Sequence, residues 1–310
     1  MVDTCLSARR VAGLLDAPGC ARRIALELSP TPDELADQLG CPPGRQSPYA
    51  HARARMFTAR CTADNAAALV ELARETIPVT RADTATLAGD LADRAAATRA
   101  RLAGADPDTL TVLHDAVLEL PIAGGVRPIA CELLAFTGSP RRLVEIRTFA
   151  RVDGLADPAQ LAAAARQVAV LTLAVEQTTA VDTQALLVLP ENFSLVPCGS
   201  LLDVAPQVRR LRRLLAGLTA APAESDTAGI RALPSRFGDG CLGCALFGFC
   251  RAERAGSAER LGTDAANLCG SAGVADALAL AHRTRTPSGP GEEAVAAGLS
   301  RAARAMELIG

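Results

Sequence analysis

The chain has 310 residues, of which 49% are hydrophobic and only 3% aromatic, and its formal net charge is −2. The length and hydrophobic content allow a sizeable core, so a globally disordered chain is excluded. The near-neutral charge excludes a basic field over the whole surface, and the low aromatic content excludes a base-stacking binder of the usual aromatic type. Any nucleic-acid contact must therefore come from a local groove, and its cations would be arginines, because all 32 basic residues are Arg.

Helical and strand patterns along the chain predict a mixed α/β fold. The first third shows helical periodicity, and strands with a tight turn, a long alanine-rich helix and a further strand follow it. At Asp157 and Pro158 the helix start combines an aspartate cap with proline at the first helical position. The predicted helices are several short ones within 8–40, then 48–75, 84–104, 157–176 and 203–218, and the predicted strands are 110–120, 129–136, 143–149 and 184–189.

Two carboxylates and an arginine lie on the predicted hairpin 127–149. Glu132 interrupts its first strand, the turn follows at Gly138–Pro140, and Glu145 and Arg147 lie in its second strand. Residues two apart in a strand share a face, so Glu145 and Arg147 point the same way. Two acids converging with a backbone carbonyl can hold Mg²⁺ or Mn²⁺, which activates water and stabilises charge on a phosphate. The alternative interpretation is an ordinary salt bridge on an exposed strand.

One group among the ten cysteines has metal-ligand spacing, the segment CLGCALFGFC. Thiolates separated by two residues can reach one metal centre, and a third can close over it. Cys241, Cys244 and Cys250 are therefore candidate ligands of Zn²⁺ or of an iron–sulfur cluster. The other elements of the predicted fold suggest Cys20 as the fourth ligand, with Cys41 as its rival. The remaining cysteines are interpreted as buried apolar residues, namely Cys5, Cys61, Cys131, Cys198 and Cys269.

Together these motifs resemble the PD-(D/E)XK nuclease superfamily, whose pattern is an Asp followed by Glu-x-Lys. A nuclease core with one Cys near the start and three near the end is similar to its iron–sulfur branch. That branch includes CRISPR-associated adaptation exonucleases, RecB- and AddB-type nuclease domains and uncharacterised actinobacterial members. The likeness runs from about Cys20 to Cys250 and includes the segments 47–50 (SPYA), 153–158 (DGLADP) and 163–167 (AAARQ).

The resemblance implies a mixed sheet flanked by helices and a 4Fe–4S cluster that ties the chain ends together. It divides the chain into a helical N-terminal region over 1–104, a nuclease-like core over 105–220, and a Cys-cluster segment with C-terminal helices over 221–310. The cluster ligands implied are Cys20, Cys241, Cys244 and Cys250; the metal ligands are Glu132 and Glu145, with Arg147 and Gln167 as further catalytic residues.

The chain departs from the family pattern within the nuclease site. Glu132 replaces the usual Asp, Arg147 replaces the Lys, and Leu171 stands where the Gln-x-x-x-Tyr motif beginning at Gln167 has its tyrosine. The early helix has Phe57-Thr58 where the family usually offers an acid or a His. Because arginine differs from lysine in shape and cannot transfer a proton, we expect an impaired nuclease-fold protein that acts on DNA in phage defence or DNA processing. The alternative is an active Mg- or Mn-dependent exonuclease or endonuclease for single-stranded DNA.

The partners implied are single-stranded DNA or DNA ends and a helicase, ATPase or defence-system protein; association into a homo-oligomer is left open. No secretory signal or apolar run of membrane-spanning length is visible, so we expect a cytoplasmic protein that does not associate with a membrane. The arginines between Arg209 and Arg213 are interpreted as a solvated helix face, or alternatively as a phosphate track. His51 and His114 are interpreted as structural rather than catalytic.

Overall fold

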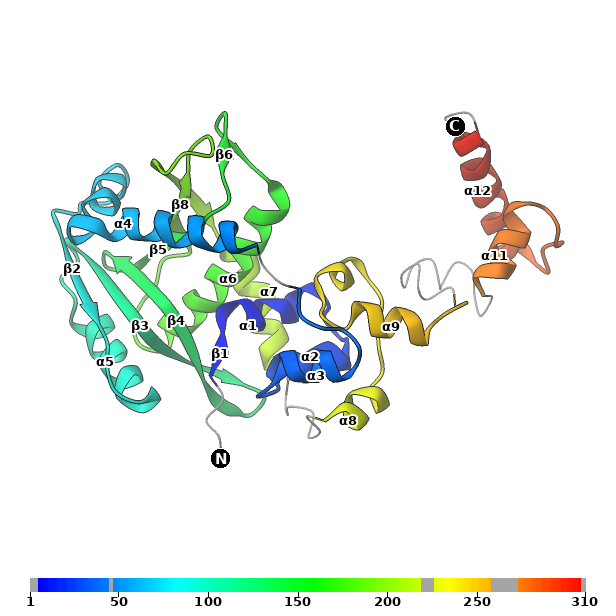
Figure 1. Cartoon of the computed structure of the whole chain (residues 1–310), viewed down its shortest axis with the longest axis horizontal. Helices are drawn as coiled ribbons and strands as arrows, with labels where there is room; N and C mark the ends of the chain where they lie inside the picture. The colour runs from blue at the N-terminus through cyan, green and yellow to red at the C-terminus, as the bar shows by residue number, and fades with distance from the viewer. Residues whose placement is uncertain (1–4, 45–46, 219–225, 258–272, 308–310) are drawn as a thin grey trace. The chain divides into compact units, whose positions relative to one another are not determined.

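The computed structural model describes residues 5–44, 47–218, 226–257 and 273–307, and Figure 1 shows the path of the chain. The chain forms two compact units, each assembled from segments that are separate in sequence. The larger unit comprises Met1–Leu15, Glu27–Pro30 and Gly44–Ala223, and the smaller unit comprises Asp16–Leu26, Thr31–Pro43 and Glu224–Gly310. The three-part division expected from the sequence stays a prediction beside this arrangement.

A curled, mixed sheet of seven strands forms the centre of the larger unit as described, with the strand order β2-β3-β4-β5-β8-β9 and with β1 beside β4. Strands β3, β4 and β5 are antiparallel neighbours, whereas β2 and β8 join them as parallel strands. The strands are β1 (Leu6–Ser7), β2 (Arg81–Thr86), β3 (Thr109–Ile122), β4 (Gly125–Thr137), β5 (Arg142–Ile146), β8 (Gln184–Pro190) and β9 (Pro197–Asp203).

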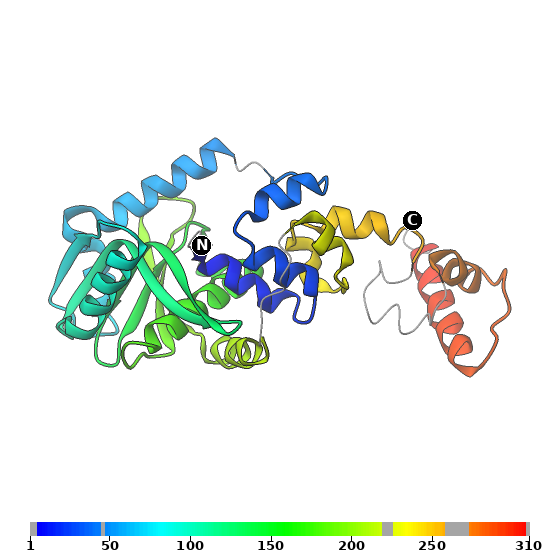
Figure 2. The same cartoon turned by 90° about the horizontal axis from the view of Figure 1, so that it is seen from below.

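Helices cover both faces of this sheet, as Figure 2 shows. The apolar side chains of β8 point alternately to the two faces and pack against a helix on each. Leu186 and Val188 face α4 (Pro48–Arg74) and belong to a core cluster with Phe57 and Leu69 of that helix. Leu187 and Leu189 point to the other face and pack with Ala164 of α6 (Pro158–Glu176). A strand buried on both faces reads as one continuous apolar run, and the segment ALLVL of β8 has this pattern.

The remaining elements of the larger unit include three further helices and a small hairpin. The predicted cap of α6 is confirmed, since the Asp157 carboxylate accepts the N–H of Gln160 at 2.8 Å. Helix α5 (Leu91–Gly104) begins with a reciprocal capping box between Asp90 and Asp93. The other elements are α7 (Ala205–Gly217), the hairpin of β6 (Arg151–Val152) with β7 (Leu155–Ala156), and α1 (Ala8–Asp16), whose last residue lies in the smaller unit.

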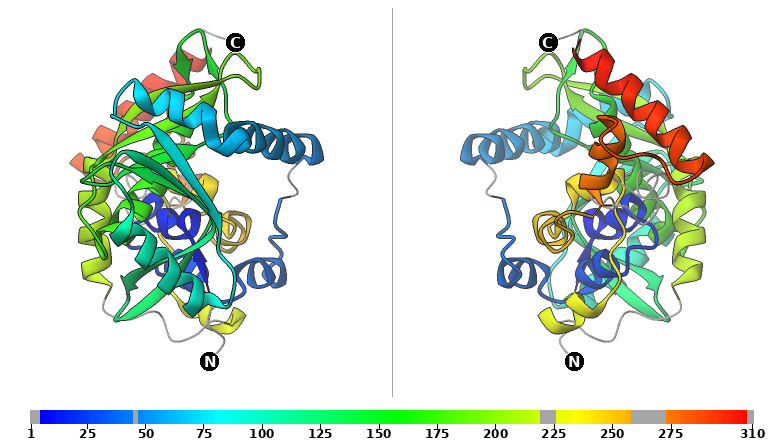
Figure 3. Two further views of the ribbon diagram at one scale, coloured as in Figure 1. Left: turned by 90° about the vertical axis from the view of Figure 1, so that its left-hand side faces the viewer. Right: turned by 90° about the vertical axis from the view of Figure 1, so that its right-hand side faces the viewer.

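The smaller unit is built from short helices around a modest apolar core. Its centre includes Leu35, Leu39, Ile230, Leu246 and Phe249. Helices α11 and α12 pack against each other, as Figure 3 shows. The elements are α2 (Ala21–Leu28, most of which belongs here), α3 (Pro32–Gln38), α8 (Thr227–Ala232), the 3-10 helix η1 (Asp239–Gly243), α9 (Phe247–Glu253), α11 (Val274–Ala281) and α12 (Pro290–Glu307).

The structure differs from the sequence-based elements at several places. The expected helix 48–75 is interrupted, because the backbone of α4 is non-helical from Ala63 to Ala66. Three further differences concern the sheet. The expected helix 84–104 included the last three residues of β2, but the polar segment RADTAT of β2 pairs with β3 as an edge strand. Strand β9 was missed because Pro197 and Gly199 are unusual in strands. Strand β5 ends at Ile146, so Arg147 lies just beyond it, although its backbone N–H still donates to Val188.

Helix α6 is the helix, among those described, that is long and apolar enough to cross a membrane. More than half of its apolar window is buried within the protein, and its residues pack on the sheet. Length and composition of this kind also occur in the core helix of a globular domain, so this feature gives only weak support for a membrane span.

The buried Arg141 ties the end of α5 to the turn between β4 and β5. Its guanidinium donates to the carbonyls of Leu102, Ala105 and Gly138 at 3.1, 2.7 and 2.8 Å. Carbonyls at a helix end and in a tight turn lack backbone partners, so this side chain satisfies groups that would otherwise be buried without a hydrogen bond.

Replacing Arg141 by Ala should lower the free energy of unfolding by about 1–3 kcal/mol, the cost of leaving buried polar groups unsatisfied. Arg141→Lys should restore only part of the loss, because an ammonium group cannot reach three carbonyls in the same planar geometry. Urea unfolding followed by circular dichroism measures this change. The exposed Arg81, also in the larger unit, provides the control, and equal losses for Arg81→Ala and Arg141→Ala would contradict the assignment.

Candidate functional site

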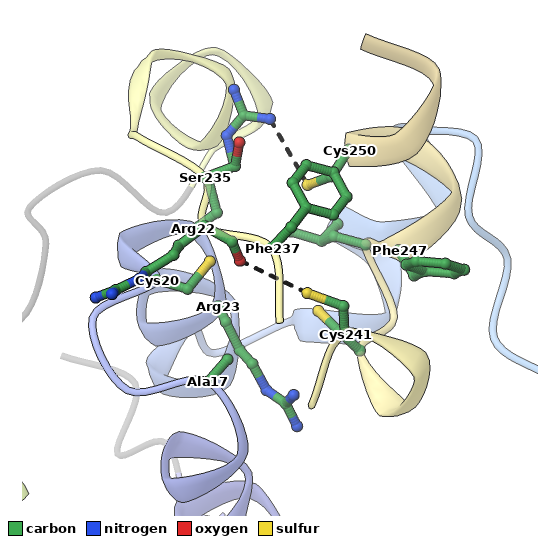
Figure 4. Close-up of a pocket in the computed structure, with 12 residues that line it drawn as sticks. Ala17, Cys20, Arg22, Arg23, Ser235, Phe237, Cys241, Phe247 and Cys250 are labelled. Carbon is green, nitrogen blue, oxygen red and sulfur yellow. Dashed lines mark hydrogen bonds between the residues drawn. The ribbon is translucent and has the colours of Figure 1, made fainter. Parts of the chain in front are cut away.

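Four cysteines predicted as cluster ligands line one cavity in the smaller unit (Figure 4). Cys20 immediately precedes α2, Cys241 lies in η1, Cys244 follows η1, and Cys250 lies in α9. The cavity has a volume of about 20 Å³. Its other lining residues are Ala17, Arg22, Arg23, Ser235, Arg236, Phe237, Leu246 and Phe247.

Successive backbone turns bring the three late cysteines together. The N–H of Cys244 donates to the carbonyl of Cys241 at 3.0 Å, which closes the two-residue spacer into a tight turn. The N–H of Phe247 then donates to Cys244, and the N–H of Cys250 donates to Leu246 in the first turn of α9. The spacing of the motif therefore places three thiols on one side of a compact loop.

Two arginines that follow Cys20 connect α2 to this loop. Arg22 donates to the carbonyls of Leu233 and Arg231, both at 2.7 Å, forms an ion pair with Glu253, and lies 3.7 Å from the Cys250 sulfur. Arg23 donates to the carbonyl of Gly240 at 2.7 Å. Sequence reasoning missed both residues, although two arginines directly after a candidate ligand were a usable signal.

Arg23 holds a very close approach between two backbone segments. Its other nitrogen donates to the Asp16 carboxylate at 3.1 Å, so one guanidinium bridges Asp16 and Gly240. A Cβ atom at Gly240 would stand 2.0 Å from the backbone oxygen of Asp16. Only glycine allows this contact, and it fixes η1 against the segment that leads to Cys20.

Burial raises the pKa of two thiols of this cavity, those of Cys244 and Cys250, and so favours their protonated form. Burial raises the pKa of Cys244 to about 11, and the N–H of Leu246 and the charge of Arg23 lower it only in part. Burial also raises the pKa of Cys250, against a hydrogen bond from Arg22. Cys20 contributes to the shift of both thiols, so these three sulfurs are close enough to influence one another. A bound metal would favour the thiolates and release their protons.

The residues around the cavity fit a metal centre in their chemistry. The thiols come from separated segments, apolar groups such as Phe237 and Leu246 shelter them, and Arg22 and Arg23 offset the negative charge that four thiolates bring. In the part of the chain that the structure describes, no three His, Cys, Asp or Glu side chains are arranged as a ready metal-binding group. The sulfurs would therefore have to turn further inward to hold one ion or cluster.

The rival ligand Cys41 does not line this cavity. It packs against the same core as Cys244 and Cys250, and its sulfur accepts the N–H of Phe249 at 3.2 Å. Cys20 thus lines the cavity, whereas the Cys41 sulfur is hydrogen-bonded to the backbone of α9. Cys61, Cys131 and Cys198 are buried as expected, Cys5 is half-buried, and Cys269 lies outside the described residues.

The predicted nuclease residues lie in the larger unit, and three of them form a connected group. Nη2 of Arg147 is 2.8 Å from Oε1 of Glu145 and donates to Oε1 of Gln167 on α6 at 2.9 Å. The Glu145 side chain is 14% exposed and that of Arg147 25%, so the bridge is not the exposed pair of the alternative interpretation. The Nε atom of Arg147 is buried and has no hydrogen-bond partner in the described structure.

Glu132 is not connected to this group. It is exposed on β4, where the ladder with β3 skips the position between the pairs His114–Leu133 and Ala116–Cys131. The unpaired residue of β3 at this position is Asp115, which has a positive φ of 56°. Within the described residues, no hydrogen bond or ion pair joins Glu132 to Glu145. The predicted metal site on these two carboxylates stays a prediction.

Other residues singled out in the sequence have these positions. His51 is exposed on α4, His114 is half-buried on β3, and Leu171, at the position of the family tyrosine, is buried in α6. The four arginines of α7 are exposed, and Arg212 forms a 2.6 Å ion pair with Glu176. This pairing is typical of a solvated helix face, and the phosphate-track alternative stays untested.

Glu145 gives a prediction for the dependence of stability on pH. Burial raises its pKa above the ordinary 4.5, and Arg147 lowers it only in part. The folded protein therefore binds this proton more tightly than the unfolded chain, so the ionised carboxylate costs stability above its folded-state pKa. That cost disappears when the pH falls below the unfolded-state value.

Glu145→Gln should therefore be more stable than the wild type at pH 7.5, and the difference should vanish below pH ~4. Urea unfolding at the two pH values measures the difference. Glu71→Gln, at an exposed position on α4, is the control and should leave stability unchanged at both. A Glu145→Gln protein that is less stable than the wild type at pH 7.5 would show that the ion pair with Arg147 outweighs burial.

Comparison with known proteins adds no family assignment to this geometry. No model of a protein family matches the chain, and no curated protein matches its sequence. The candidate sites are therefore defined by the cysteine-lined cavity of the smaller unit and by the Glu145–Arg147–Gln167 group of the larger unit.

Proposed function

We propose that this protein is a nuclease-fold iron–sulfur protein that acts on DNA in a reducing, cytoplasmic compartment, with an impaired nuclease site. The observation that carries the proposal is the meeting of Cys20 with Cys241, Cys244 and Cys250 at one sheltered cavity. Four thiols that come from segments far apart in sequence and line one cavity are an arrangement that a metal centre requires, whereas packing alone does not bring thiols together. As ligands they would join those segments covalently through a metal.

The finer fold assignment is part of this proposal. The PD-(D/E)XK architecture expected from the sequence is supported by the antiparallel strands β3, β4 and β5, the parallel strand β8 and the helices α4 and α6 on opposite faces. Glu145 at the end of β5 and Gln167 on α6 are joined by Arg147. This contact is compatible with a site derived from that superfamily.

The role proposed for the cysteines is to hold a 4Fe–4S cluster that fixes the smaller unit. Such a cluster supplies four metal–thiolate bonds when bound, and in this role it needs no redox chemistry. Arg22 places a positive charge beside Cys250, and Arg23 places one near Cys244. Both therefore stabilise the thiolate forms that ligation requires.

Protein purified without oxygen should be brown and contain about four irons and four sulfides per chain. Cys244→Ser should lose most of this iron and become poorly soluble, whereas Cys61→Ser, at a buried cysteine of the larger unit, should keep it. Iron and acid-labile sulfide analysis with the absorption spectrum measures both. Stoichiometric zinc without iron would contradict the cluster and indicate a zinc site.

The impaired nuclease site follows from the geometry of Arg147. In the superfamily that the sequence resembles, this position is a lysine, which acts as a compact charge beside one water. Here the guanidinium already binds the Glu145 carboxylate, so it competes with a metal for the same oxygen. We expect weak Mg²⁺ binding, somewhat better acceptance of Mn²⁺ and slow or undetectable cleavage of DNA.

The test compares wild type, Arg147→Lys, Glu145→Ala and the double variant on labelled single-stranded DNA with Mn²⁺. A gain of cleavage in Arg147→Lys, absent from the double variant with Glu145→Ala, is the expected result because lysine frees the carboxylate. Iron content should be the same in all variants, since the changes lie in the larger unit. Rapid wild-type cleavage that Glu145→Ala abolishes would instead establish the alternative, an active Mg- or Mn-dependent nuclease.

A further inference from the structure

One side of α4 carries an exposed strip of arginine, aromatic and thioether side chains. Tyr49, Arg53, Met56 and Arg60 recur every three or four residues, so they follow one another along the helix surface. Tyr49 is 87% exposed and Met56 58%. Residues 47–62 include three arginines and no acidic residue, although the whole chain has a net charge of −2. This segment of α4 is therefore basic, although the protein as a whole has a slightly negative net charge.

A strained turn places an exposed phenylalanine beside this strip. Asn192 and Phe193, between β8 and β9, have φ values of 46° and 60°, and the N–H of Ser194 donates to Glu191 at 2.8 Å. These features define a mirror-image turn that favours Asn followed by Gly. Phenylalanine at the second position is strained, yet its side chain is 68% exposed and is not used in the core.

The neighbouring elements hold this turn in place. Arg53 donates to the carbonyls of Phe193 and Ser194, so the strip and the turn are in direct contact. On its other side the turn is bonded to the β6–β7 hairpin, where Asn192 donates to Arg151 and accepts from the N–H of Asp153. A strained turn held from two sides presents its aromatic ring in a fixed position.

The chemistry of this surface matches single-stranded DNA. A single strand offers unstacked bases to aromatic rings and phosphates to arginines, whereas a duplex hides its bases. Tyr49 and Phe193 are exposed aromatics in a chain that has few, and Arg60 supplies charge along the same side of the helix. We propose that Phe193 and the α4 strip form a single-stranded DNA contact, in which Phe193 stacks on one base and the arginines bind adjacent phosphates.

This inference rests on the proposed action on DNA and specifies the surface used. This surface is separate in its residues from the cysteine cavity and from the Glu145 group. Both of those sites can therefore be intact even if the proposed DNA contact is wrong. Two acidic residues lie near the turn: Glu191 is paired with Arg151, which reduces its charge, and Asp153 is exposed.

The first test measures binding of a fluorescent single strand by anisotropy with Phe193→Gly and Phe193→Tyr proteins. Glycine removes the ring and relieves the positive φ, so the variant should melt at the same or a higher temperature while its affinity falls about tenfold or more. Tyrosine keeps the ring and should keep the affinity. Val126→Ala, at an exposed apolar residue near the start of β4, should change neither property.

The second test concerns charge. Log affinity should fall with log salt concentration, and Arg60→Gln should reduce that slope by about 0.7, the contribution of one phosphate contact on a single strand. Arg99→Gln, an arginine of α5 paired with Glu119, is the matched control and should leave the slope unchanged. A duplex of the same sequence should bind more weakly than the single strand.

Wild-type affinity in Phe193→Gly, an unchanged slope in Arg60→Gln, or equal binding of single strand and duplex would overturn the proposed surface. If any of these is found while iron content and DNA binding remain normal, the proposed function survives and only this surface is wrong. If the wild type binds no DNA, this surface and the DNA part of the proposed function both fall.

Discussion

Two buried arginines bring together the parts of the smaller unit that come from opposite ends of the chain. Arg22 and Arg23 are only 6% and 3% exposed, and their guanidinium groups reach the carbonyls of Arg231, Leu233 and Gly240. A charge buried at this depth is unfavourable unless it is hydrogen-bonded and paired, and Glu253 and Asp16 supply the pairing. Because the apolar core of this unit is modest, the position of Cys20 beside the later cysteines depends on these contacts.

The two candidate sites place opposite demands on their arginines. Beside the cysteines, Arg22 and Arg23 favour the charged thiolates and so assist ligation. In the larger unit, Arg147 occupies the Glu145 carboxylate and leaves its own Nε without a partner. An arginine therefore assists a site whose thiols must lose their protons, and it obstructs a site where a hard cation needs a free carboxylate oxygen.

Local signals in the sequence identified much of the fold. Asp157 and Pro158 marked the start of α6 correctly, because capping and proline geometry depend on few residues. The spacing of Cys241, Cys244 and Cys250 likewise placed three thiols at one cavity. Such features depend on the nearest few positions and on the helical or strand period, which a single sequence displays directly.

Features that depend on distant segments could not be predicted. Strand β2 has a polar sequence, and only pairing with β3 makes it a strand. Gly240 has no local turn signal that explains it, since its requirement is the oxygen of Asp16. The sparse aromatic content argued against base stacking, but composition does not show that Tyr49 and Phe193 are both exposed near one arginine.

The discontinuity of the smaller unit has a consequence for biosynthesis. Cys20 and the arginines after it are made early, but their partners begin at residue 224, after the sequence of the whole β-sheet. At ordinary translation rates this interval is on the order of ten seconds. The larger unit can form its sheet on the ribosome during that time, whereas Cys20 remains without the later cysteines beside it. Assembly of the smaller unit is therefore a late event, and a chain truncated before residue 224 carries Cys20 without the cavity that shelters it.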